Sequence, residues 1–151
     1  MPFWLAIHLP ALPLEAVLDS SEPVDADGVR AMSQTIPACI TEQGRIVALS
    51  SLLEKAGAHI GMSIAAASTL VPDLVVKPRA VQFEASLLQR VALAISRYTP
   101  CLIVEADGLL LELSSTLRLF GGQRKLIRAI RSTVHECGVS SLRLAKASTA
   151  K

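Results

Sequence analysis

Residues 101–113 have the sequence CLIVEADGLLLEL, in which two apolar runs are separated by Asp107-Gly108. An Asp-Gly pair between two such runs is the strongest short-range signal for a tight β-hairpin. The sequence therefore predicts strands over 101–106 and 109–113, with Asp107-Gly108 as the turn.

Two amphipathic helices are expected on either side of this hairpin. The first spans about 80–98, and its apolar residues recur at helical spacing on one face: Leu87, Val91, Ile95 and Tyr98. The second spans about 123–137 and ends at Gly138; its inward residues are Leu126, Ile130 and Val134. Further strands are expected at 3–9 and 142–145. This order predicts an α+β fold, a ferredoxin-like (split βαβ) sheet packed on two helices.

A small lobe is expected between the first strand and the first long helix. It contains a hairpin around Gln43-Gly44, a capping box that begins a short helix at Ser51, and an Ala-rich helix that begins at Ser63. A short strand is expected at 74–77. Residues 20–34 are polar and are expected to form a mobile loop.

Composition excludes several classes of protein. The chain has 151 residues, 51% of them hydrophobic, and a net charge of +2, which excludes a disordered chain. No apolar stretch approaches the roughly 18–20 residues of a membrane span, and the N-terminus does not resemble a signal peptide. Three widely spaced cysteines argue against a disulfide framework or a zinc site. We therefore expect a cytoplasmic protein with no membrane contact.

Five short motifs occur in an order that resembles the palm and fingers of Y-family translesion DNA polymerases. They are Val47-Ala48-Leu49, Gly57-Ala58-His59-Ile60-Gly61-Met62, Pro72-Asp73-Leu74, Asp107-Gly108-Leu109-Leu110-Leu111-Glu112 and Leu119-Phe120-Gly121-Gly122. The resemblance extends to the ImuB-type branch, whose members are non-catalytic polymerase homologues. It implies that residues 1–14 and 80–151 form the polymerase palm with its sheet. Residues 15–79 would form a small fingers lobe inserted into the palm. The thumb and little finger are expected to follow residue 151.

The resemblance implies a metal site that has lost most of its ligands. Family members carry Asp-x-Asp on the first strand and Asp-Glu at the palm hairpin. The corresponding positions here are His8, Pro10, Asp107 and Gly108. A two-metal site needs several carboxylates, so we expect that no Mg²⁺ cofactor is bound. Asp107 is explained as a turn residue, and a residual role as a metal ligand stays open.

The site for the incoming nucleotide is also expected to be degenerate. The Tyr, Arg and Lys that hold the triphosphate in the family correspond to Ser51, Glu54 and Ser148. Glu54 would repel the triphosphate rather than bind it. We therefore interpret the chain as a pseudo-polymerase, a scaffold that is not an enzyme.

Two groups of basic residues are candidate contacts for DNA. Arg143, Lys146 and Lys151 lie near the end of the chain and are tentative DNA-binding residues, with weak, salt-sensitive affinity. A cationic stripe on the second long helix is either a solvated face or a contact to a partner or to DNA; it consists of Arg124, Lys125, Arg128 and Arg131.

The resemblance also implies the partners of the full-length protein. It indicates DNA repair and SOS mutagenesis, in a complex with a sliding clamp, an error-prone replicative-type polymerase and a RecA-like accessory protein. These contacts are expected mostly outside this chain, which could also self-associate.

Two alternatives remain open. One is an active Y-family polymerase with an unusual set of metal ligands. The other is a ferredoxin-like regulatory module, which would have no fingers lobe between the first strand and the long helix.

Overall fold

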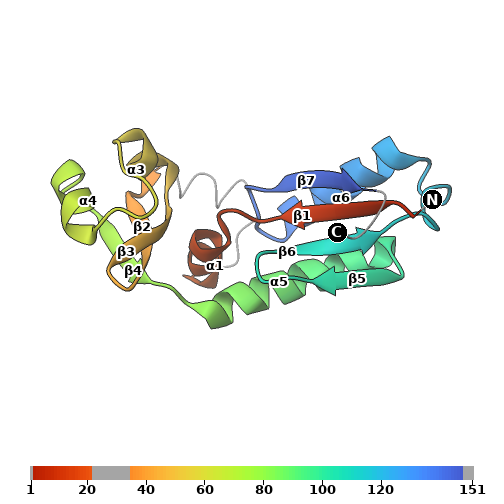
Figure 1. Ribbon diagram of the computed structural model, residues 1–151, viewed down its shortest axis with the longest axis horizontal. Helices are drawn as coiled ribbons and strands as arrows, with labels where there is room; N and C mark the ends of the chain where they lie inside the picture. The colour runs from red at the N-terminus through yellow and green to blue at the C-terminus, as the bar shows by residue number, and fades with distance from the viewer. Residues whose placement is uncertain (1, 22–34, 148–151) are drawn as a thin grey trace.

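The computed structural model describes residues 2–21 and 35–147. Its larger sheet has four antiparallel strands in the order β5-β6-β1-β7 (Figure 1). These strands are β1 (Trp4–His8), β5 (Cys101–Val104), β6 (Gly108–Glu112) and β7 (Arg143–Ala147). Two helices pack on one face of this sheet, α5 (Val81–Ile95), which continues into the 3₁₀ turn η1 (Ser96–Tyr98), and α6 (Gln123–Glu136). The predicted split βαβ sheet on two helices is confirmed.

The core of this lobe lies between the sheet and the helices. Alternate residues of β1 and β6 face the helices because side chains in a strand alternate between faces. Leu5 and Ile7 of β1 are paired with Leu111 and Leu109 of β6. They pack against the apolar faces predicted for the two helices: Leu87, Val91, Ile95, Leu126, Ile130 and Val134, all buried.

A second lobe is inserted between β1 and α5, at the left of Figure 1. Its sheet has the order β3-β2-β4. The strands are β2 (Ala38–Glu42), β3 (Arg45–Leu49) and β4 (Val75–Pro78), and the helices are α3 (Ser51–Lys55) and α4 (Ile64–Leu70). A regulatory module without such a lobe is therefore not the architecture of this chain.

Helix α1 (Leu12–Ser21) lies between the two lobes (Figure 1). Leu12 and Ala16 belong to the core of the larger lobe. Leu14 packs with Ala38 and Ile40 of the smaller sheet. Most of the loop expected at 20–34 lies outside the described residues.

Two local predictions are corrected by one residue. The turn between β5 and β6 is centred on Ala106 and Asp107, because the amide of Glu105 donates a hydrogen bond to the carbonyl of Gly108 at 2.8 Å. Gly108 is therefore the first residue of β6, not part of the turn. The cap of α3 is Ser50, not Ser51, since the Ser50 hydroxyl accepts from the amide of Leu53 at 3.4 Å. Across residues 2–21 and 35–147, no helix is long and apolar enough to cross a membrane.

Candidate functional site

The face of the larger sheet that points away from α5 and α6 is called the open face, and it carries His8 and Gly108 of the residues expected at the active centre. Asp107 lies in the turn before β6, and Pro10 lies in the turn after β1. His8 is the last residue of β1 and is paired with Gly108 on β6 and Arg143 on β7. Neighbouring residues in such pairs have side chains on the same face. His8 and Arg143 therefore lie side by side at one end of the open face.

His8 and Asp107 form a direct contact at this end of the sheet. His8 Nε2 donates a hydrogen bond to Asp107 Oδ2 over 3.1 Å, and the amide of Leu9 donates to the Asp107 carbonyl at 2.8 Å. The side chains of His8 and Asp107 are 45% and 66% exposed. A polar contact at this exposure contributes at most about 1 kcal/mol to stability. The pair therefore adds little to stability, and both side chains are accessible to a ligand.

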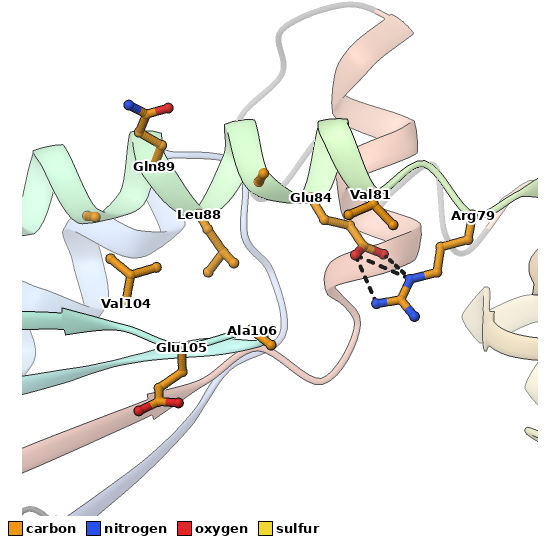
Figure 2. A pocket seen from close by; sticks show the side chains of 10 residues that line it. Arg79, Val81, Glu84, Leu88, Gln89, Val104, Glu105 and Ala106 are labelled. Carbon is orange, nitrogen blue, oxygen red and sulfur yellow. Dashed lines mark hydrogen bonds and ion pairs between the residues drawn. The ribbon is translucent and has the colours of Figure 1, made fainter.

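Glu105 is a second carboxylate at this end that the sequence analysis did not identify. The hydrogen bond of its amide to Gly108 places it opposite that glycine, in the row of His8 and Arg143. Figure 2 shows its side chain pointing away from α5. Strand alternation alone puts Glu105 on the open face, but only the observed turn puts it in this row.

Gly108 keeps the strands close at this position. A Cβ atom at residue 108 would lie 2.0 Å from the carbonyl oxygen of Ile7, far inside van der Waals contact. A carboxylate at residue 108 therefore has no room unless the backbone of β1 or β6 moves.

Arg79 joins the two lobes close to this end of the sheet (Figure 2). Its guanidinium donates to both carboxylate oxygens of Glu84, Nε to Oε1 at 2.9 Å and Nη2 to Oε2 at 3.1 Å. Nη1 donates to Glu42 Oε2 of β2 at 3.1 Å. These hydrogen bonds to Glu84 and Glu42 raise the pKa of Arg79. No local sequence signal links the three residues.

A cavity of about 440 Å³ adjoins this ion pair, between α5 and the tip of β5. Its walls are mostly apolar, from Val81, Leu88, Val104 and Ala106 (Figure 2). Arg79 and Glu84 form its polar end.

Residues 23–149 match the model of the impB/mucB/samB family. The chain belongs to the impB/mucB/samB family. No curated protein sequence matches it.

Solved structures with the same fold include a ternary complex of Dbh, with a TM-score of 0.75 and 13% identity over 96% of this chain and 41% of that one. DinB from Sulfolobus solfataricus has a TM-score of 0.69 and 13% identity, and the likeness covers 96% of this chain and 42% of the DinB chain. A Y-family DNA polymerase chimera of Dbh and Dpo4 has a TM-score of 0.68 and 12% identity, and the likeness covers 95% of this chain and 42% of the chimera. At such identities the likeness shows the fold, and this family member spans about two-fifths of each solved chain.

The interpretation of this family member as a non-enzyme is wrong. The chain belongs to the impB/mucB/samB family and has the α+β fold of solved Y-family DNA polymerases, over almost its whole length. Missing carboxylates at three positions, His8, Pro10 and Gly108, were too narrow a basis for that conclusion.

The residues present do not fit a pair of Mg²⁺ ions. Mg²⁺ requires near-octahedral oxygen ligands, and this end of the sheet supplies one imidazole, from His8, and two carboxylates, from Asp107 and Glu105. In the part of the chain that the structure describes, no three His, Cys, Asp or Glu side chains form a group that could hold a metal. The loss of the Mg²⁺ site stays a prediction.

The other candidate residues of this family member lie in separate places. Ser51 and Glu54 are on α3 in the smaller lobe, and Glu54 is exposed. Ser148 and Lys151 lie outside the described residues. Arg143 and Lys146 are both exposed on β7. Because they are three residues apart on a strand, they point to opposite faces of the sheet.

Proposed function

We propose that this chain is the palm-and-fingers part of a Y-family-like protein that acts on DNA in translesion synthesis, in the bacterial cytoplasm. The observation that carries the proposal is the pair of lobes: a four-stranded palm sheet with an open face and a fingers lobe inserted after its first strand. The TM-score of 0.75 to a Dbh ternary complex covers both lobes. The match to the impB/mucB/samB family model also supports this proposal.

The proposed division of the chain assigns residues 1–14 and 80–151 to the palm and 15–79 to the fingers. Its first boundary falls inside α1, whose residues pack on both lobes. The arrangement supports a fingers lobe that is held against the palm by α1 and by Arg79.

The DNA contact proposed for this chain is on the open face, beside His8. Arg143 is exposed there, and an exposed guanidinium binds phosphate oxygens of the DNA backbone well. A metal pair at the same place would need more carboxylates than the two that this end of the sheet offers, Glu105 and Asp107, and Asp107 already accepts a hydrogen bond from His8.

We extend the proposal to the complex in which the full-length protein acts. The resemblance to the ImuB-type branch supports a role in damage-induced mutagenesis, with a sliding clamp, an error-prone replicative-type polymerase and a RecA-like accessory protein. The chain spans about two-fifths of the solved structures, and these contacts are assigned to other parts of the protein.

The test uses the full-length protein and a primer–template duplex, with binding measured by fluorescence anisotropy. Arg143→Glu should weaken binding several-fold, because it places a negative charge next to the phosphates. The control Arg118→Glu makes the same charge change at an exposed residue outside the open face. Equal affinities for the parent and the Arg143→Glu variant would contradict the proposed contact.

A second measurement tests the role in synthesis. Primer extension across an abasic site is measured with the full-length protein and its replicative-type partner, in Mg²⁺ and in Mn²⁺. The proposal expects bypass that requires this protein. Bypass that is unchanged without it would contradict the translesion role.

A further inference from the structure

A groove lies between α6 and β7 on the helix side of the larger sheet, away from the open face. Three cationic side chains line it, Arg124 and Arg131 from α6 and Lys146 from β7. Ile127 and Leu144 form its apolar part, and its volume is about 420 Å³. Two elements that are adjacent in Figure 1 thus bring their positive charges to one hollow.

The three cations of this groove form no ion pair within the described part of the chain. The described residues that line it include no carboxylate. If the cationic stripe of α6 were only a solvated face, its side chains would point away from the rest of the protein. Here, in contrast, β7 contributes a third cation, Lys146, to the groove that Arg124 and Arg131 line. The groove is therefore suited to an anionic ligand.

The positive charge continues round the edge of the sheet. β7 is an edge strand in the order β5-β6-β1-β7. Arg143 is on its open face and Lys146 on its helix face, with both side chains exposed. A flexible anionic chain that passes over this edge would contact Arg143 first, then Lys146, and then the two arginines of α6.

We propose that the groove between α6 and β7 binds the phosphates of single-stranded DNA that continues from the open face round the edge of β7. The proposal rests on the proposed function, which places a primer–template duplex on the open face. Duplex DNA has a persistence length of about 150 bp and resists so sharp a bend, whereas a single strand is flexible enough to follow it. The single-stranded part of the template is the segment that this geometry fits.

The contact is expected to be independent of base sequence. Among the described residues, no aromatic side chain on which a base could stack lines the groove. Arginine and lysine contacts to phosphates carry no sequence information and depend strongly on salt. An acidic protein segment is a different polyanion, and the test below separates it from DNA.

The experiment compares two DNA ligands on the full-length protein, a blunt duplex and the same duplex with a single-stranded template overhang. Affinity is measured by fluorescence anisotropy over a series of salt concentrations. The parent should bind the overhang ligand more tightly and with a steeper salt dependence. In the variant Arg124→Gln/Arg131→Gln/Lys146→Gln, the slope of log K against log salt for the overhang ligand should fall by about 2, since each single-strand phosphate contact contributes roughly 0.7.

The controls separate this proposal from the proposed function. The variant should bind the blunt duplex as the parent does, and Lys125→Gln, a charge change on α6 outside the groove, should leave the overhang affinity unchanged. Thermal unfolding followed by circular dichroism checks that the variants are folded. The inference is overturned if the overhang adds no affinity. It is also overturned if Lys125→Gln lowers the affinity for the overhang ligand by as much, per charge removed, as the triple groove variant does. Loss of blunt-duplex binding with Arg143→Glu would still support the open-face contact.

An acidic peptide of Glu residues is added as a competitor. The proposal expects that it displaces the overhang only at concentrations far above those of single-stranded DNA of equal charge. The inference is overturned if the peptide binds more tightly than the DNA, and if the groove variant loses the peptide but still binds the overhang ligand as the parent does.

Discussion

Gly108 is the residue on which the spacing of β1 and β6 depends at the open-face end. Its backbone does not adopt a positive φ, so the glycine is needed for space and not for a turn. A Cβ atom would lie 2.0 Å from the Ile7 carbonyl oxygen, and β1 and β6 would have to separate beside His8.

Gly108→Ala should therefore lower the free energy of unfolding by about 1–3 kcal/mol, the usual cost of an overpacked site. Urea denaturation followed by circular dichroism measures it. Ala106→Ser adds one atom at an exposed turn residue and should change stability by less than about 0.5 kcal/mol. Equal stabilities for the two variants would show that the strands adjust at no cost.

Glu15 is a buried carboxyl group that anchors the segment before β7 to α1. Its Oε1 accepts hydrogen bonds from the Ser140 hydroxyl at 2.8 Å and from the amides of Ser140 and Ser141 at 3.3 and 3.0 Å. Its Oε2 is buried with no partner among the described atoms. Burial raises the pKa of Glu15 from 4.5 to about 7, although these hydrogen bonds lower it in part.

The raised pKa predicts a loss of stability as the pH rises. Between about pH 4.5 and 7 the folded protein binds more protons at Glu15 than the unfolded chain does, so the free energy of unfolding falls with increasing pH. The total effect is at most about 3 kcal/mol. Glu15→Gln should remove most of this slope in urea denaturation at pH 5, 6, 7 and 8. Glu105→Gln, at an exposed carboxylate, should keep the parent's profile; a Glu15→Gln variant that also keeps it would contradict the prediction.

The connection between β4 and α5 depends on Arg79 and its two partners. The side chain of Glu84 is only 5% exposed, whereas that of Glu42 is 50% exposed. A buried carboxylate that loses its partner keeps its desolvation cost, and an exposed one does not. Arg79→Gln should therefore lower the free energy of unfolding by about 2 kcal/mol or more.

The matched control at this connection is Glu42→Gln, which removes the exposed partner and keeps the buried pair. Its cost should stay below about 1 kcal/mol. Both values come from urea denaturation at neutral pH. A cost for Glu42→Gln as large as that for Arg79→Gln would mean that the link between the lobes, not the buried pair, provides the stability.

Elements defined by local spacing were predictable from the sequence. The helices at 81–95 and 123–136 follow from their apolar periodicity. The hairpin at Gln43-Gly44 follows from local turn preference, and both residues have the positive φ that this turn requires, 53° and 75°. The turn after β5 was misplaced by one residue because the approach of Gly108 to Ile7, 101 positions away, determines it.

The candidate site was predictable only in part. The contact of His8 with Asp107 depends on the pairing of strands far apart in the chain, and only the family resemblance suggested it. The link from Arg79 to Glu84 and Glu42 has no local signal at all. The opposite directions of Arg143 and Lys146 were missed as well, because the predicted last strand ended at residue 145, whereas β7 continues to Ala147 and includes Lys146.

At the scale of the whole molecule, three separate groups of buried residues hold the chain together. The largest lies under the palm sheet, and another fills the fingers lobe around Cys39, Ile46 and Leu53. In this second group, burial raises the pKa of the Cys39 thiol. The third group is small and joins α1 to the fingers sheet. The fingers lobe is thus held to the palm by a few side chains of one helix, together with Arg79.

This arrangement predicts that the two lobes can be loosened separately. Leu14 faces the fingers sheet and Leu12 faces the palm core, both only 2% exposed, and a buried Leu→Ala change costs about 2–5 kcal/mol. Leu14→Ala should speed hydrogen exchange of amides in β2 and β3 while those of β1 and β6 stay protected, because local opening follows local packing. Leu12→Ala should have the reverse effect, which makes it the matched control. Hydrogen exchange followed by mass spectrometry measures both; if each variant speeds exchange equally in the two sheets, palm and fingers open as one cooperative unit and α1 does not separate them.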